Sequence, residues 1–181
     1  MKFMTSFKLL LALAISLWSF TTNGQGDKIS LEISTQKDTL VIGQPVIFKV
    51  VITNIWKKSI QLTKDFTFTS NMYPNPIELV NKGATLEFEF EPNPVNNPIW
   101  DEGQDLDPSI EFQELKPSES ITIEYDFNKH LREFLSAKSD GVPTSSNYKL
   151  RLNYKLNRKH KQFNLVTGQF QSNQLTVYIK E

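Results

Sequence analysis

Residues 85–91 read TLEFEFE, and residues 148–156 read YKLRLNYKL. In both stretches apolar and polar residues alternate without a break, which is the period of a β-strand with one buried and one solvated face. In the first stretch we expect Leu86, Phe88 and Phe90 to point inward and the three glutamates to point outward. The two stretches therefore predict two long strands, each with a polar outer face.

The rest of the chain continues this pattern. Residues 46–54 (VIFKVVITN) carry apolar side chains on both faces, so we expect a central strand that is covered on both sides. Residues 128–137 (NKHLREFLSA) instead space their apolar residues at helical intervals and predict one short helical crossing. Further strands are expected at residues 29–34, 121–127 and 175–179, and weaker candidates lie at 60–62, 66–69, 77–80 and 110–112.

Four segments resemble the strand signatures of immunoglobulin-like β-sandwich domains in exported bacterial proteins. They lie at residues 43–54 (GQPVIFKVVITN), 115–120 (LKPSES), 148–151 (YKLR) and 172–177 (SNQLTV). Ser118 stands where the family pattern has glycine. The cysteines and the core tryptophan of antibody domains have no counterpart in the pattern.

This resemblance covers roughly residues 29–179 and concerns the fold alone. The fold class that it implies is all-β: an antiparallel immunoglobulin-like β-sandwich, here with one short helical crossing. Such a domain has about 100 residues, and this chain is longer. We therefore expect an inserted hairpin and a long loop between residues 63 and 109.

The first 24 residues have the three parts of a cleavable signal peptide. Lys2 and Lys8 form the positive start, residues 9–20 (LLLALAISLWSF) are mostly apolar, and small or polar residues precede Gln25. The apolar run is shorter than the roughly 20 residues of a membrane span. We predict a signal peptide at 1–24 and a single domain at 25–181. The protein is then secreted or periplasmic, with no membrane anchor after cleavage, since the chain also lacks the cysteine that lipid attachment requires.

The charges are balanced overall and uneven along the chain. Lysine and arginine total 20, as do aspartate and glutamate, which gives no basic field for a nucleic-acid partner. Acids dominate residues 87–126, and residues 149–180 carry bases without acids. We expect an acidic strand to pair with a basic strand in one sheet. The alternative is a bipolar surface that docks a charged partner.

Catalytic patterns are missing from the sequence. His130 and His160 are its two histidines, and neither has a second histidine at metal-ligand spacing. No nucleophile elbow and no glycine-rich phosphate loop occurs. Three glutamates align at residues 87–91, but strand alternation alone produces that arrangement, so it does not require glycoside hydrolysis. We therefore expect no catalytic residues and a protein that is not an enzyme.

Two aromatic residues are candidates for ligand binding. Tyr73 and Trp100 both lie beside prolines, and Trp100 belongs to the long loop at residues 92–108 (PNPVNNPIWDEGQDLDP). Exposed aromatic side chains stack on sugar rings or anchor protein partners. The alternative, which we favour, is a small apolar cluster under the loop.

The same loop contains a group of acids. Asp101, Asp105 and Asp107 could supply oxygen ligands to calcium, but their spacing does not match the EF-hand pattern. A solvated acidic loop is therefore the favoured interpretation, and calcium is the one cofactor that the sequence leaves open.

These observations favour an exported, non-enzymatic binding or interaction module with a protein or glycan partner. Two alternatives remain: an inhibitor of a secreted hydrolase that inserts the loop at 92–108 into its target, and a carbohydrate-active protein. The sequence gives neither the ligand nor the oligomeric state.

Overall fold

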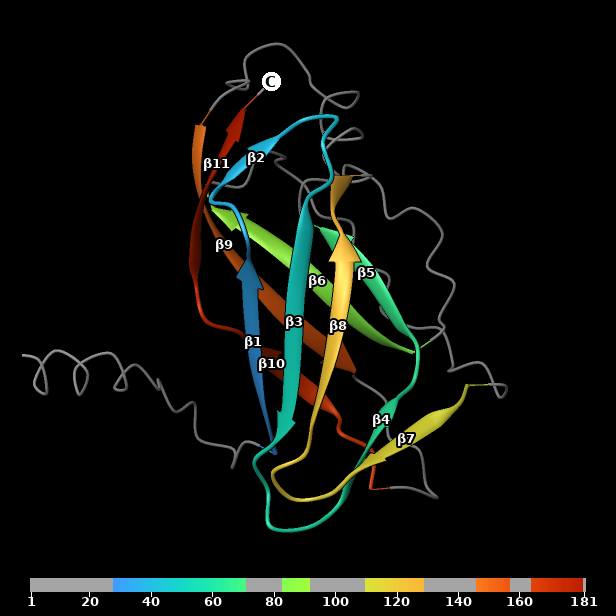
Figure 1. Cartoon of the computed structure of the whole chain (residues 1–181). Coiled ribbons are helices and arrows are strands. Elements are labelled where there is room, and N and C mark those ends of the chain that lie inside the picture. Colours follow the sequence, from blue (N-terminus) through green and yellow to red (C-terminus); the bar gives the residue numbers. More distant parts are fainter. Residues whose placement is uncertain (1–27, 71–82, 92–109, 129–145, 157–163, 181) are drawn as a thin grey trace, which may run out of the picture.

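The computed structural model describes residues 28–70, 83–91, 110–128, 146–156 and 164–180, and strands dominate these ranges (Figure 1). A helix long and apolar enough to cross a membrane does not occur in them. The strands are β1 (Ile29–Thr35), β2 (Thr39–Val41), β3 (Ile47–Asn54), β4 (Ile60–Thr63), β5 (Phe66–Ser70), β6 (Ala84–Glu91), β7 (Phe112–Leu115), β8 (Ser120–Asp126), β9 (Ser146–Leu156), β10 (Gly168–Gln171) and β11 (Leu175–Lys180).

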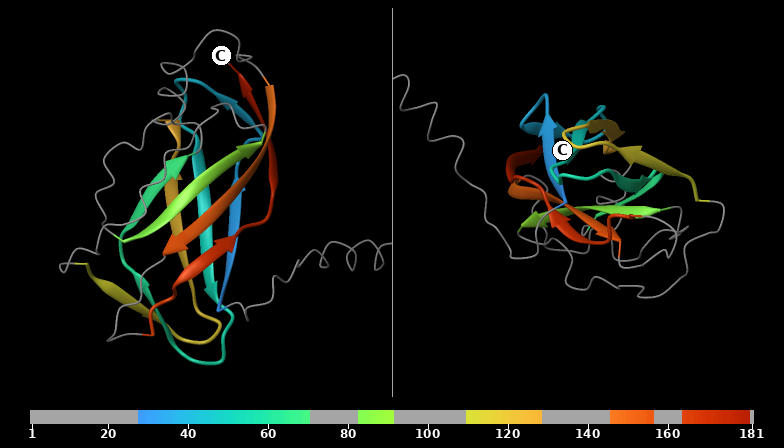
Figure 2. Two further views of the ribbon diagram at one scale, coloured as in Figure 1. Left: turned by 180° about the vertical axis from the view of Figure 1, so that it is seen from behind. Right: turned by 90° about the horizontal axis from the view of Figure 1, so that it is seen from below.

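These strands form three sheets. The first has the order β1-β3-β8, and the second has the order β2-β11-β9-β6-β5 with β10 beside β9. β4 and β7 make a short two-stranded sheet. The two larger sheets face each other like the layers of a sandwich, and the second is curled (Figures 1 and 2). The fold is all-β, as the alternation predicts.

Two pairings correct the expectation of a purely antiparallel sandwich. β2 pairs in parallel with β11, and β5 pairs in parallel with β6, so the second sheet is mixed. Consecutive parallel strands need a crossover connection rather than a tight hairpin, and residues 71–82 give the chain the length for one. Alternation contains no information on strand direction, which is why the sequence does not reveal these two pairs.

All six of the main strand predictions are confirmed, as β1, β3, β6, β8, β9 and β11. Among the weaker candidates, 60–62 and 66–69 are β4 and β5, whereas the strand expected at 110–112 lies instead at Phe112–Leu115. β2 and β10 are not predicted. The candidate at 77–80 and residues 129–137 of the expected helical crossing lie outside the described residues.

Aromatic side chains from both large sheets meet in the core. Phe48 of β3 contacts Phe88 of β6, with ring centroids 5.2 Å apart, and Phe127 lies 4.8 Å from Phe88. Phe68 of β5 stacks on Tyr125 of β8 at 3.9 Å, where the edges of the two sheets meet. Burying aromatic rings is the largest contribution that single side chains make to a core. This cluster therefore joins the two layers.

The outer face of β3 differs from the prediction. β3 is central in its sheet, but Ile47 is 40% exposed and Val51 is half-buried. The expectation that β3 is covered on both faces is therefore wrong. A second apolar face indicated a covering layer, whereas here isolated apolar residues lie in a largely polar outer surface, as is common for exposed sheets.

A bulge between β10 and β11 ties the two sheets together. Three residues, 172–174, lie opposite two residues of β9, because Gln171 pairs with Asn153 and Leu175 pairs with Leu150. Such a bulge redirects side chains. The Asn173 amide donates to the Ile33 carbonyl at 3.0 Å and accepts from the Ile33 N–H at 2.8 Å. It thereby satisfies part of the open edge of β1.

Candidate functional site

Asn54, the last residue of β3, organises one end of the sandwich. Its side chain is fully buried. The amide nitrogen donates to the carbonyls of Lys58 and Leu115, both at 2.9 Å, and the amide oxygen accepts from the Trp56 N–H at 2.9 Å. One buried side chain thus fixes the loop after β3 and ties it to the end of β7.

Trp56 lies within this loop with two ammonium groups over its ring. The indole is partly buried against the core. Lys28 Nζ lies 5.1 Å from the ring centroid and Lys58 Nζ lies 5.6 Å from it, both within cation–π range. The Ile55 N–H donates to the Lys28 carbonyl at 3.0 Å, which joins the loop to the residue before β1.

The turn between β7 and β8 lies beside this loop. The Glu119 N–H donates to the Lys116 carbonyl at 3.0 Å, and Ser118 has a φ of 67° after Pro117, which is the geometry of a type II turn. The Ser118 N–H donates to the Asn54 carbonyl, and the Asn54 N–H donates to the Glu119 carbonyl, both at 2.9 Å. Ser118 therefore adopts the left-handed conformation that the glycine of the family pattern favours.

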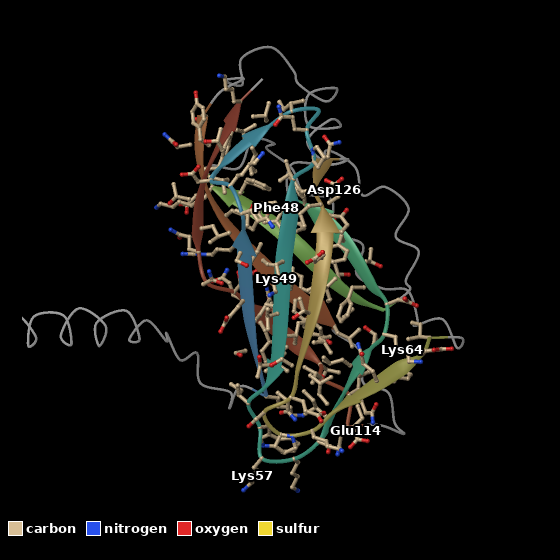
Figure 3. All side chains as sticks on the ribbon, in the orientation of Figure 1. Phe48, Lys49, Lys57, Lys64, Glu114 and Asp126 are labelled. Atoms are coloured by element: carbon tan, nitrogen blue, oxygen red, sulfur yellow. The ribbon has the colours of Figure 1, made fainter. Side chains whose placement is uncertain are left out.

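We name this end of the molecule the Trp56 tip and define it as Lys28, residues 55–58 and the turn at 116–119. Ile55 is 54% exposed, the largest exposed fraction among the large apolar side chains in the described ranges. Lys57 is also exposed, and Figure 3 shows it at the extreme end of the molecule. The tip combines an exposed aliphatic side chain, a tryptophan and several ammonium groups. This chemistry is suited to binding an anionic partner.

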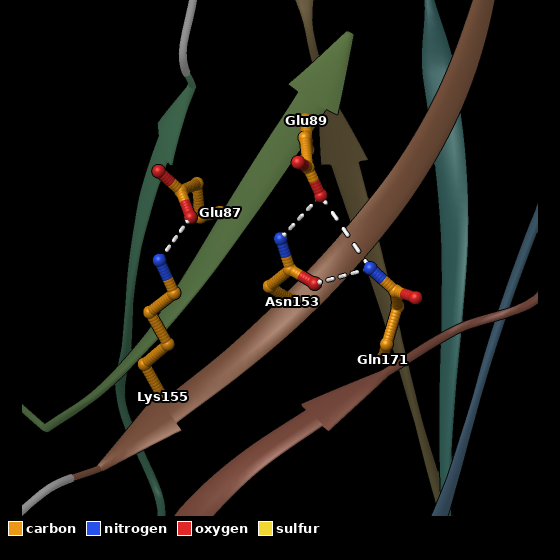
Figure 4. A network of polar contacts seen from close by, with 5 residues as sticks. All are labelled: Glu87, Glu89, Asn153, Lys155 and Gln171. Carbon is orange, nitrogen blue, oxygen red and sulfur yellow. Dashed lines mark hydrogen bonds and ion pairs between the residues drawn. The ribbon is translucent and has the colours of Figure 1, made fainter. Parts of the chain in front are cut away.

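A second polar cluster lies on the outer face of β6, β9 and β10 (Figure 4). Lys155 Nζ lies 2.5 Å from Glu87 Oε2. Glu91 is paired in register with Lys149, whose Nζ lies 4.0 Å from the Glu91 carboxylate. The predicted pairing of an acidic strand with a basic strand is confirmed for β6 and β9.

This cluster also corrects one expectation about the glutamates. Glu87 is only 6% exposed, so it does not point freely into solvent, because the Lys155 side chain lies against it. Glu89 Oε2 accepts hydrogen bonds from Asn153 at 2.9 Å and from Gln171 at 3.4 Å. Both carboxylates are therefore engaged by neighbouring side chains, as is typical of a structural network.

The ligand-binding and calcium-binding residues that the sequence predicts, and both histidines, lie outside the residues that the structure describes. Within the ranges that the structure describes, no group of three or more His, Asp or Glu side chains could hold a metal ion. The candidate residues from the sequence that lie outside those ranges are Tyr73, Trp100, Asp101, Asp105, Asp107, His130 and His160.

Sequence reasoning did not single out the Trp56 tip. Its one local signal is NIWKKS at residues 54–59, where a tryptophan and two lysines directly follow a strand. Lys28 and Lys116 are remote in sequence, and only the fold brings their segments to the same end.

Comparison of the sequence with protein-family models and with curated proteins gives no match. The interpretation of the site therefore rests on its own geometry.

Proposed function

We propose that this protein is an exported, non-enzymatic binding module built on an immunoglobulin-like β-sandwich, and that it binds its partner through the Trp56 tip. The observation that carries the proposal is the tip itself. The Ile55 side chain is exposed next to Lys57 and Lys58, and the buried Asn54 amide fixes the loop through hydrogen bonds to its backbone. A preorganised loop loses less conformational entropy on binding.

Support for the immunoglobulin-like assignment comes from the roles of the signature residues. Asn54, which ends the first signature, holds the tip together. Ser118 in the second signature keeps the left-handed turn. In the last signature, the Ser172 hydroxyl accepts from the Leu152 N–H at 2.9 Å, and Asn173 bridges to β1. Asn54, Ser172 and Asn173 therefore each bond through the side chain to backbone groups at a turn or at the edge of a strand.

Support for a non-enzymatic role comes from the polar cluster on β6 and β9. Lys155 engages the carboxylate of Glu87, and Asn153 and Gln171 engage the carboxylate of Glu89. The two carboxylates of a glycoside hydrolase flank the scissile bond of a bound sugar. Glu87 and Glu89 instead form hydrogen bonds across the surface of the sheet.

Export is tested by recovering the protein from cells that express the full chain. The mass of the protein in the periplasmic and culture fractions is measured. The expected polypeptide begins at Gln25, because cleavage removes the apolar segment at residues 9–20. Recovery of the full-length mass from the cytoplasm alone would contradict export.

Binding through the tip is tested by retention on isolated cell-envelope fractions. We expect the double variant K57E/K58E to lose retention, because it reverses two exposed charges of the tip. The matched control is K37E/K180E, which makes the same charge change at two exposed lysines outside the tip, one between β1 and β2 and one at the end of β11. Equal retention of both variants would contradict binding through the tip.

Hydrolase capture and glycan binding, measured with the same tip variant, separate the two alternative functions. Capture of one secreted hydrolase, with loss of that enzyme's activity, would indicate an inhibitor instead. Glycan binding that is lost in Trp100→Ala and kept in K57E/K58E would indicate a carbohydrate-binding loop at residues 92–108. Either result would replace the Trp56 tip as the binding site.

A further inference from the structure

The charge of the Trp56 tip differs from that of the whole chain. The chain has equal numbers of acidic and basic residues. The tip contains four lysines, at positions 28, 57, 58 and 116, and one acid, Glu119. Because the loop and the turn are joined through Asn54, these ammonium groups belong to one rigid end. Such a local field attracts an anionic surface even where the net charge is zero.

The apolar side chains of the tip narrow the choice of partner. Ile55 is exposed at the outside of the loop, and Trp56 lies directly beneath the lysine ammonium groups. A stacking site for a sugar requires an open aromatic face, whereas Lys28 and Lys58 already lie over this ring. An exposed aliphatic residue, a tryptophan and flanking lysines are the combination found where proteins meet the membrane interface.

We propose that the Trp56 tip binds the anionic phospholipid surface of a membrane. The lysine ammonium groups contact lipid phosphates, and Ile55 enters the boundary between headgroups and acyl chains. This inference rests on the proposed function and adds the chemical class of the partner.

The test is co-sedimentation of the exported protein with vesicles. One set contains phosphatidylcholine with phosphatidylglycerol, and the other contains phosphatidylcholine alone. We expect binding to the first set only, decreasing with added salt. The variant K57E/K58E should bind at least about 30-fold more weakly, from the loss of two lysine contacts. The control K37E/K180E should bind like the unmodified protein.

Ile55→Ser tests the apolar contact separately. We expect about fivefold weaker binding to the anionic vesicles, because one aliphatic side chain no longer leaves water. Unchanged binding would overturn the insertion of Ile55 and leave a purely electrostatic contact, which contradicts the proposal as stated.

The remaining outcomes separate this inference from the proposed function. Absence of binding to anionic vesicles at low salt, together with envelope retention that K57E/K58E abolishes, overturns the lipid inference alone. Binding to dextran sulfate, but not to vesicles, also overturns it and indicates an anionic glycan. Envelope retention that is unaffected by K57E/K58E overturns the proposed function itself.

Discussion

Replacing Asn54 with alanine is expected to loosen the Trp56 tip and destabilise the whole fold. The side chain is fully buried and makes three hydrogen bonds, to Lys58, Leu115 and Trp56. A hydrogen bond contributes about 1 kcal/mol net, and a buried partner left unsatisfied adds to the loss. We therefore expect the free energy of unfolding to fall by about 3 kcal/mol. For a domain of this size, that corresponds to a melting temperature lower by about 10 °C.

The assay is urea unfolding followed by circular dichroism, with Asn164→Ala as the matched control. Asn164 is exposed, so the same chemical change should alter stability by less than about 0.5 kcal/mol. If Asn54→Ala loses less than about 1 kcal/mol, the amide does not hold the loop, and the argument for a preorganised tip fails. A second readout is envelope retention, which should decrease at temperatures where the variant is still folded.

Three further predictions concern other parts of the fold. Ser118→Gly should stabilise the protein by about 1 kcal/mol in urea unfolding, because glycine adopts φ of 67° without the steric cost that serine has; a loss of stability would contradict the turn geometry. Lys155→Met should lower the free energy of unfolding by about 3 kcal/mol, since it leaves the Glu87 carboxylate buried and unpaired. The double variant with Glu87→Gln should recover most of that loss. Additive effects of the two substitutions in this double-mutant cycle would show that Lys155 and Glu87 are not coupled. Burial raises the pKa of Tyr125 from 10.0 to about 12. Its neutral phenol therefore contributes stability that is complete below pH 10 and is lost as the pH rises towards 12, and Tyr125→Phe should retain more stability than the unmodified protein over that window.

The alternation of apolar and polar residues predicts the strands well, and it predicts their inner faces. Leu86, Phe88 and Phe90 are buried as expected, because a strand with one apolar face has a single favourable orientation. The charge distribution likewise predicts that an acidic strand pairs with a basic strand in one sheet, and β6 and β9 form such a pair. These features depend on residues that are close in sequence or on a charge pattern that spans whole strands.

Other features depend on contacts that no local pattern contains. The parallel pairings of β2 and β5 follow from the path of the chain rather than from side-chain periodicity. Glu87 is buried because Lys155 lies against it, which a strand considered alone does not indicate. The Trp56 tip is assembled from segments that precede β1, follow β3 and precede β8. Its charge becomes apparent only when those segments are brought together by Asn54.

The most direct test of the central claim places a photo-crosslinking amino acid at each of three exposed apolar positions in turn: Ile55, Ile47 and Tyr178. They lie on the Trp56 tip, on the open face of β3 and near the end of β11, respectively. The three proteins are exported from cells, irradiated, and analysed by mass spectrometry. We predict an adduct from position 55 and none from positions 47 and 178. Adducts from position 47 or 178, with none from position 55, would contradict the assignment of the tip as the binding face.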